Sequence, residues 1–367
     1  MKWMKIRVLT AVMLVIAMMF TLCAAGCAGK TETKVEKQTE SKSQVENKAP
    51  AKSNAAFQEA EAKLLDSLKP LPEKGKRYKL AALEITLANP FWVTMKQGYE
   101  EAAKEYGVDI DVLAAPKEDD INSQLDTLKA LVVKGYDAIA ISAITPFNLI
   151  SGVAEANKKG IPVVAVGTSI DEKAAAEQGA KVEAFITSDF AEQGRLGARF
   201  IVEKVKSGKV AIIEGLAGAA QGEARKNGAK EVFESSPGIQ LVSVQPGDWD
   251  RQKAYDLTVN LLQAHPDLKG IFCANDVMAL GAVEALKAKG KKQQVTVVGV
   301  DFIDEARESI AKGELDGTVA MSPYLFGKGG VILMLKVLQG HQITEDIYWT
   351  PLALVNKSNV HTFEGWH

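Results

Sequence analysis

The alternation of short apolar segments with longer amphipathic segments constrains the fold of this 367-residue chain more than any other feature. From about Tyr78 onward, apolar runs such as "LAALEIT", "YDAIAIS" and "IPVVAVG" alternate with helical patterns such as those at 91–106 and 120–134. Strands that alternate with helices in this way are typical of a parallel sheet covered by helices on both faces. The sequence therefore predicts an α/β fold.

The same series begins a second time after the short strand "EAFITS". Strand patterns "KVAIIEG", "IQLVSVQ", "LKGIFCA" and "VTVVGV" alternate there with further helical patterns, and "VVAVG" at 163–167 has its counterpart in "VVGVD" at 297–301. A chain of this length with 47% hydrophobic residues can fill two cores. We therefore expect two doubly wound parallel-sheet lobes of similar design.

The N-terminus has the order of parts of a secretory signal. Three basic residues within the first seven precede an uncharged stretch at 8–26. Such a stretch is also long enough for a signal anchor that spans a bilayer. Its ending "AAGC", however, resembles a bacterial lipoprotein signal, although Ala24 stands where that pattern usually has Leu. The resemblance implies that residues 1–26 are removed and that Cys27 is acylated and holds the protein at a membrane surface.

Residues 27–77 are expected to form a tether between this anchor and the folded body. The part up to about Asn54 has mixed charges, no aromatic residues and few bulky apolar groups, so it cannot bury enough surface to fold. Phe57, Leu64, Leu65 and Leu68 then recur at helical spacing. They predict a short helix packed on the body and ended by "KPLPEKGK".

Charge argues against a nucleic-acid-binding protein, and cysteine content excludes a fold held together by disulfides. Without residues 1–26 the chain has 41 basic and 46 acidic residues, a formal charge of −5, which argues against nucleic acid as a partner. Cys23 leaves with the signal and Cys27 carries the lipid, so Cys273 has no partner for a disulfide. Within "GIFCAND", Cys273 is interpreted as a small buried hydrophobe rather than a nucleophile.

Polar and aromatic residues collect directly after the predicted strands. In sheets of this kind, ligands bind beyond the carboxyl ends of the strands, so these residues are candidates for a ligand site. The first series of strands is followed by Asn89, Phe91, Trp92, Gly167 and Thr168, and the second by Glu214, Arg225, Trp249, Asp250, Asn275, Asp276 and Asp301.

Several motifs together resemble a known family. They are "NPFWVTMKQG", "ARKNG", "DWDRQKA", "AHPDLKGIFCANDVMALGAVEAL" and "VVGVDF". Their order and spacing between about Tyr78 and Lys357 resemble the ribose- and galactose-binding type of bacterial solute-binding proteins, also called type I periplasmic binding proteins. The resemblance implies two lobes that hinge shut on a small solute and are joined by three crossing segments near Ser188, Met321 and Leu352. The implied lobes comprise residues 78–188 with 322–351 and residues 189–321 with 352–367.

The resemblance also implies roles for the strand-end residues. Asn89 would bind sugar hydroxyls from the first lobe, and Arg225, Asn275 and Asp301 would bind them from the second. The aromatic rings would stack on the apolar faces of the sugar ring, which suits the chemistry of both partners. These aromatic residues are Phe91, Trp92 and Trp249.

Two departures from the family pattern bear on the ligand. Gly167-Thr168 stands where ribose-type members have an Asp-Arg pair, and Met321 stands where they have a hinge Gln. We still assign all three positions to the ligand site. A charge-assisted hydrogen bond contributes about 1.5–3 kcal/mol. The absence of the Asp-Arg pair therefore disfavours ribose and favours a deoxy sugar, a polyol, a larger sugar or a non-sugar solute.

Each of these residues also has a purely structural interpretation. Phe91 and Trp92 are alternatively core residues of the first helix, and Trp249 plugs a loop. Arg225 alternatively pairs with a nearby Glu, and Asp301 caps the following helix. The remaining ambiguous positions are Asn275 and Asp276, of which one is expected to cap a helix and the other to face a ligand, and Glu84, which is expected either to pair with a Lys or Arg or to contact the ligand.

Catalysis has little support in the sequence. None of the four histidines follows a strand beside a serine, cysteine or acid, and no His/Cys cluster or acidic loop has metal-ligand spacing. The segment "GLAGAAQG" lacks the spacing of a nucleotide-binding loop. We therefore expect a binding protein, not an enzyme, with no cofactor and no metal.

The expected function is that of a lipid-anchored solute-binding protein of an ABC importer. It would act as a monomer on the outer face of the cytoplasmic membrane, bind a monosaccharide or similar small polar solute, and deliver it to the transmembrane permease subunits. The alternative is a ligand-sensing subunit that reports to a membrane receptor kinase or chemoreceptor. The two-lobed fold serves both functions equally well.

Overall fold

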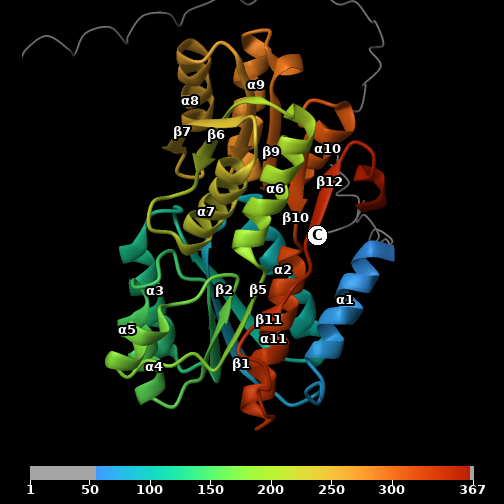
Figure 1. Ribbon diagram of the computed structural model, residues 1–367. Coiled ribbons are helices and arrows are strands. Elements are labelled where there is room, and N and C mark those ends of the chain that lie inside the picture. Colours follow the sequence, from blue (N-terminus) through green and yellow to red (C-terminus); the bar gives the residue numbers. More distant parts are fainter. Residues whose placement is uncertain (1–54, 364–367) are drawn as a thin grey trace, which may run out of the picture. The chain divides into compact units, whose positions relative to one another are not determined.

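Strands in the described part of the chain form two six-stranded sheets (Figure 1). This computed structural model describes residues 55–363, so the expected signal, Cys27 and the tether before Ala55 lie outside it. In spatial order, the first sheet consists of β11 (Tyr348–Trp349), β5 (Ala184–Thr187), β4 (Val163–Val166), β3 (Ala138–Ile141), β1 (Lys79–Thr86) and β2 (Asp109–Ala115). The second consists of β12 (Ala353–Asn356), β10 (Gly317–Ala320), β9 (Thr296–Asp301), β8 (Leu268–Cys273), β6 (Gly208–Glu214) and β7 (Ile239–Pro246).

Helices pack on each sheet, and each sheet with its helices is called a lobe below. The pairs of neighbouring strands are parallel except for β10 and β12, so the expected doubly wound α/β fold is confirmed. The first lobe carries α1 (Ala55–Ser67), α2 (Pro90–Tyr106), α3 (Ile121–Lys134), α4 (Ile150–Lys158), α5 (Glu172–Glu177) and α11 (Pro323–Leu338). The second carries α6 (Phe190–Val205), α7 (Ala220–Ser235), α8 (Arg251–Ala264), α9 (Asp276–Ala288), α10 (Asp304–Lys312) and the 3-10 helices η1 (Lys292–Gln294) and η2 (Val360–Phe363).

Burial on both faces explains the composition of the central strands. β3 reads AIAI and β4 reads VVAV, and every residue of both strands is buried. Several helices start where a short polar side chain accepts a backbone hydrogen bond, as at Asn89 before α2, Asp120 before α3 and Asp250 before α8. Among residues 55–363, no helix combines the length and apolar character needed to cross a bilayer.

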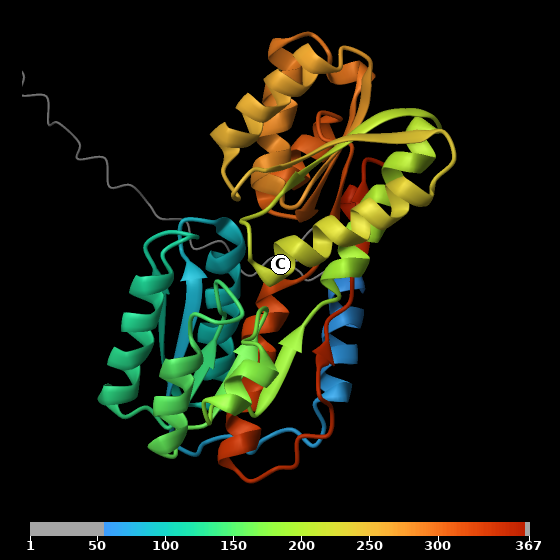
Figure 2. The same cartoon turned by 60° about the vertical axis from the view of Figure 1, so that its left-hand side comes forward.

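Three segments run between the lobes, at the places where the chain leaves one sheet for the other (Figure 2). The first follows β5 at Ser188 and leads to α6, and the second follows β10 at Met321 and leads to α11. The third connects β11 to β12 through residues 350–352. The three-segment hinge expected near these positions is therefore confirmed.

The helix predicted from the Phe57–Leu68 pattern is present as α1, and it contacts α11 (Figure 1). Phe57, Leu64 and Leu68 are buried, and the ammonium of the buried Lys336 in α11 donates to the carbonyl of Leu68 at 2.7 Å. The short helix expected within residues 27–77 therefore packs on the first lobe.

Two buried ionisable residues of the sheets differ in how well the sequence predicted them. Cys273 is a buried free thiol in β8, as interpreted from its apolar neighbours. Glu84 in β1 is fully buried, and neither of its carboxylate oxygens has a hydrogen-bond partner. It does not line the pocket described below, so both interpretations offered for it, an ion pair and a ligand contact, were wrong.

Candidate ligand-binding site

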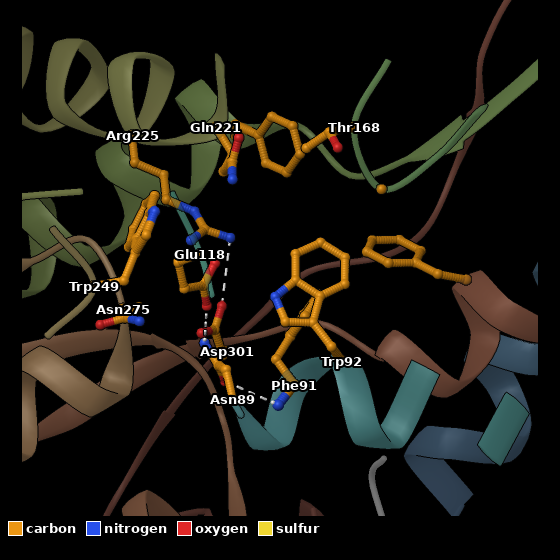
Figure 3. A pocket seen from close by; sticks show the side chains of 13 residues that line it. Asn89, Phe91, Trp92, Glu118, Thr168, Gln221, Arg225, Trp249, Asn275 and Asp301 are labelled. Carbon is orange, nitrogen blue, oxygen red and sulfur yellow. Dashed lines mark hydrogen bonds and ion pairs between the residues drawn. The ribbon is translucent and has the colours of Figure 1, made fainter. Parts of the chain in front are cut away.

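A pocket lies between the carboxyl ends of the strands of the two sheets, and Figure 3 shows the side chains that line it. It encloses about 410 Å³, counting the space open to solvent, within the range of small-molecule sites. Nine of the ten residues assigned to the ligand site from the sequence line this pocket. They are Asn89, Phe91, Trp92, Gly167 and Thr168 of the first lobe and Arg225, Trp249, Asn275 and Asp301 of the second.

The first turn of α2 supplies the aromatic wall on the first lobe. Asn89 caps this helix by accepting from the Phe91 amide at 3.0 Å, which places Phe91 and Trp92 at the pocket. The two rings pack edge to face with centroids 5.0 Å apart, and Phe91 packs in the same way on Phe326 at 6.2 Å. Phe91 and Trp92 are only 7% and 5% exposed, so they belong to the core and the pocket wall at once.

Trp249 forms an aromatic wall on the second lobe. Its indole lies against Gly215 at the end of β6, where an added Cβ would come within 2.0 Å of the ring. Only glycine leaves room for the ring there. In the view of Figure 3, Trp249 and Trp92 lie on opposite sides of the Glu118 and Asp301 carboxylates.

Backbone strain is concentrated beside the pocket. Of the five non-glycine residues with positive φ in the part of the chain that is described, four are Asp248, Trp249, Asp301 and Phe302. Such conformations cost about 1–3 kcal/mol each and are typically retained where a side chain must be aimed at a functional site. The strain therefore favours a functional role for Trp249 and Asp301.

Arg225 of α7 is held on several sides within the second lobe. Its Nε donates to the Gln193 side-chain oxygen at 2.6 Å, and an Nη donates to the Ala274 carbonyl at 2.9 Å. The other Nη lies 3.4 Å from an Asp301 carboxylate oxygen. The alternative interpretation, in which Arg225 pairs with a nearby glutamate, was wrong, because its ion pair is with Asp301.

Burial governs the protonation of the pocket acids. It raises the pKa of Asp301 to about 7, with the Arg225 charge acting in the opposite direction. Burial also raises the pKa of Glu118, while hydrogen bonds from Asn89 and Trp92 lower it. The side-chain nitrogen of Asn89 donates to a Glu118 carboxylate oxygen at 3.0 Å. The two acids come from different lobes, so a ligand between them can donate hydrogen bonds to both.

The prediction for Asn275 and Asp276 was wrong in its division of roles. Asn275 caps α9 by accepting from the Met278 amide at 2.9 Å, and it also lines the pocket. Asp276 is fully buried and accepts from the Ile303 amide at 3.0 Å and the Thr318 hydroxyl at 2.6 Å. It therefore holds the turn after β9, and Asp301 does not cap α10.

Met321 is the one assigned residue that does not line the pocket. It is fully buried at the second crossing segment, and its sulfur lies 3.1 Å from the side-chain nitrogen of Gln193. Its place at a crossing segment agrees with the prediction, but its side chain packs into the hinge and does not reach the pocket. Thr168 does line the pocket, and its hydroxyl donates to the Ala143 carbonyl at 2.8 Å.

Four lining residues were missed: Glu118, Phe190, Gln221 and Phe326. Glu118 follows β2 in the charged loop "APKEDD", which resembles an ordinary solvated turn. A strict survey of every strand end would have included it. Phe190, Gln221 and Phe326 each lie in the first turn of the helix that follows a strand, as Phe91 and Trp92 do, so a survey of every first helical turn would have included them.

Comparison with known proteins agrees with this geometry. A family model described as "Periplasmic binding protein domain" matches residues 85–342, and the chain belongs to this family. Among its relatives is a D-allose-binding periplasmic protein of Escherichia coli, 47% identical over 252 residues, which are 68% of this chain and 81% of the relative. A ribose import binding protein of Bacillus subtilis is 35% identical over 280 residues, covering 76% and 87%. These relatives are substrate-binding proteins, not enzymes.

Solved structures show the same likeness. A periplasmic solute-binding protein of an ABC transporter from Actinobacillus succinogenes, with bound D-allose, has a TM-score of 0.74 and 33% identity. The match covers 77% of this chain and 99% of that one. A solute-binding protein from Agrobacterium vitis, bound with α-D-tagatopyranose, matches with a TM-score of 0.73 and 28% identity, covering 77% and 96%.

Proposed function

We propose that this protein binds a neutral monosaccharide between its lobes, and that an aldohexose of the D-allose type is the first candidate. The observation that carries the proposal is the pocket itself. It joins indole and phenyl faces with hydrogen-bonding side chains from both lobes, and a sugar presents apolar C–H faces and a rim of hydroxyls to such groups. The relative named for D-allose binding and the matched structure with bound D-allose support this ligand class.

The ionisable groups of the pocket favour a ligand without negative charge. Glu118 and Asp301 contribute two carboxylates, and Arg225 is the single cation among the residues that line the pocket. Arg225 already lies beside Asp301. A sugar acid or sugar phosphate would meet Glu118 without a matching cation, whereas sugar hydroxyls can donate to both carboxylates.

Ligand-driven closure is the proposed mechanism. A solute that touches Trp92 and Glu118 on one lobe and Trp249 and Asp301 on the other gains its full contacts only when the lobes are together. Only such a difference in affinity shifts the population toward the closed form. A micromolar dissociation constant corresponds to about −8 kcal/mol, which stacking and several buried hydrogen bonds can supply.

The cellular role we propose is delivery of the sugar to the permease of an ABC importer. One relative is a ribose import binding protein, and one matched structure is a solute-binding protein of an ABC transporter. The proposed anchor is a lipid on Cys27, exposed after removal of residues 1–26, which would hold the protein on the outer face of the cytoplasmic membrane.

A thermal-shift screen tests the proposed ligand class. The panel contains D-allose, other neutral hexoses, pentoses, polyols and a set of sugar acids and sugar phosphates. Because a ligand stabilises the native state by RT ln(1 + [L]/Kd), a neutral hexose should raise the melting temperature most and the anionic sugars should not raise it. A response to the anionic sugars alone, or to no sugar at all, contradicts the proposal.

A further inference from the structure

A buried hydrogen-bonded chain connects the hinge to the pocket. Its centre is Gln193, near the start of α6, which is fully buried and does not line the pocket. The side-chain oxygen accepts from Arg225 Nε at 2.6 Å. The side-chain nitrogen donates to the Ser188 hydroxyl at 2.7 Å and lies 3.1 Å from the Met321 sulfur. Ser188 and Met321 lie on two different crossing segments.

We propose that Gln193 is a positioning residue that makes the orientation of Arg225, and with it the sugar affinity, depend on the conformation of the hinge. This inference rests on the proposed function, because it assigns Arg225 to the ligand. It adds a group that never touches the ligand and that nonetheless determines how tightly the ligand is held.

The contacts of Arg225 explain what Gln193 contributes. With Nε bound to Gln193 and one Nη bound to the Ala274 carbonyl, the guanidinium meets Asp301 through a single Nη at 3.4 Å. An unconstrained guanidinium prefers to bind a carboxylate through two parallel N–H groups. Gln193 prevents this arrangement, which leaves donors of Arg225 and oxygens of Asp301 available for sugar hydroxyls.

The backbone fixes the distance between the two helices that carry this contact. Gly194 of α6 lies against the Arg225 carbonyl of α7, where an added Cβ would come within 2.0 Å of the oxygen. At Gly228 of α7, an added Cβ would likewise come within 2.1 Å of the Ala191 carbonyl oxygen. The helices thus touch backbone to backbone, so the contact between Gln193 and Arg225 is carried by a closely packed helix pair.

The other half of the Gln193 amide senses the hinge. Hinge motions are absorbed by a few residues at element ends, and Ser188 and Met321 occupy two such places. Rotation at either segment changes the position of the hydroxyl or the sulfur relative to the Gln193 nitrogen. Because the same planar amide also holds Arg225 Nε, that change reaches the guanidinium.

The first test compares two buried glutamines by calorimetric titration with D-allose. Gln193→Met keeps the side-chain length and removes both halves of the amide. Gln124→Met is the matched control, because Gln124 is also fully buried on a helix and bonded through both halves of its amide, to Ser142, Ile144 and Asn148 in the first lobe. We expect Gln193→Met to raise the Kd at least tenfold and Gln124→Met to change it less than threefold.

The second test does not alter Gln193. The variant Ser188→Ala removes the hydroxyl acceptor of the amide nitrogen and keeps the Met321 sulfur, which also lies 3.9 Å from an Nη of Arg225. We expect it to raise the Kd at least fivefold in the wild-type background and less than twofold in the Gln193→Met background. Such non-additivity marks residues that act through one another. Additive effects would overturn the inference.

The pH profile separates positioning from a merely structural role. Asp301 faces Arg225 of α7, Glu118 of the β2–α3 loop and Asp276 of α9. The ionised Asp301 carboxylate accepts sugar hydroxyls best, so D-allose affinity should fall as the pH drops and Asp301 is protonated. If loss of Gln193 lets Arg225 bind Asp301 through two N–H groups, this fall must occur at a lower pH in Gln193→Met. An unshifted profile, or equal loss in Gln193→Met and Gln124→Met, overturns the inference. Failure of the wild type to bind D-allose would instead count against the proposed function.

Discussion

At the scale of single residues, the pocket depends on side chains with two roles. Asn89 and Asn275 each cap a helix through the amide oxygen, which leaves the amide nitrogen free to point elsewhere. In Asn89 that nitrogen donates to Glu118. Each asparagine is therefore oriented by secondary structure before any ligand arrives, which lowers the entropic cost of binding.

Asp301 should make ligand affinity depend on pH. Burial raises the pKa of its carboxyl to about 7, and a hydroxyl donated by the ligand is accepted best by the ionised form. A ligand that favours the ionised form gains affinity as the pH rises through this value. Calorimetry should give a Kd for D-allose about tenfold higher at pH 6 than at pH 8. Asp301→Asn should bind weakly and without this dependence, and equal wild-type affinities at the two pH values would refute the assignment.

Glu84 should make the protein less stable as the pH rises. Burial raises the pKa of its carboxyl to about 9, well above the value in an unfolded chain. The neutral acid is favoured in the fold, so its contribution is fully present below the unfolded pKa and is lost as the pH rises toward 9. At about 1.4 kcal/mol per pKa unit, the loss at pH 8 is a few kcal/mol.

Glu84→Gln therefore tests this expectation by thermal unfolding at pH 5 and pH 8. The variant should melt at a higher temperature than the wild type at pH 8 and differ little at pH 5. Glu177→Gln, at an exposed position of α5, is the control and should change neither. A Glu84→Gln variant with the wild-type pH profile would mean that the buried carboxyl is not protonated in the fold.

At the scale of elements, strands and helices followed from the sequence because burial dictates their composition. β3 and β4 are apolar throughout because both faces of the sheet are covered. The polar residues that follow such apolar strands were therefore recognisable in the sequence. The direction of a side chain was not encoded in this way. Met321 lies at a strand end but packs into the hinge, whereas Glu118 lies in a charged loop but turns into the pocket.

α1 should contribute to the stability of the first lobe even though it lies outside the residues matched by the family model. Leu64 is 1% exposed in this helix, so Leu64→Ala removes a core contact and should cost about 2–5 kcal/mol in the free energy of unfolding. The neighbouring Lys63→Ala changes a residue whose side chain is 68% exposed and is the control. Denaturant unfolding that gives Leu64→Ala the stability of the wild type would show that α1 is not part of the cooperative core.

At the scale of the whole folded unit, the central point is that ligand contacts are divided between two lobes. Trp92 belongs to the first lobe and Trp249 to the second, and each contributes an aromatic wall to the pocket. Neither lobe alone presents both aromatic walls. A ligand that stacks on both rings therefore links its affinity to the closure of the hinge.

Replacing either tryptophan should weaken binding by itself. We expect Trp92→Ala and Trp249→Ala each to raise the Kd for D-allose about 10- to 100-fold, which corresponds to about 1.4–2.8 kcal/mol, because each removes an aromatic face that stacks on the sugar. Trp349→Ala is the matched control, since that indole is 54% exposed and does not line the pocket. Calorimetric titration in which only one of the pocket tryptophans matters would contradict the sharing of the ligand between lobes.

The most direct measurement is a crystal structure of the protein grown with D-allose. The account predicts one sugar ring between Trp92 and Trp249, with hydroxyl oxygens at hydrogen-bond distance from the Asp301 carboxylate of one lobe and the Glu118 carboxylate of the other. A sugar bound to a single lobe, or bound outside this pocket, would contradict it.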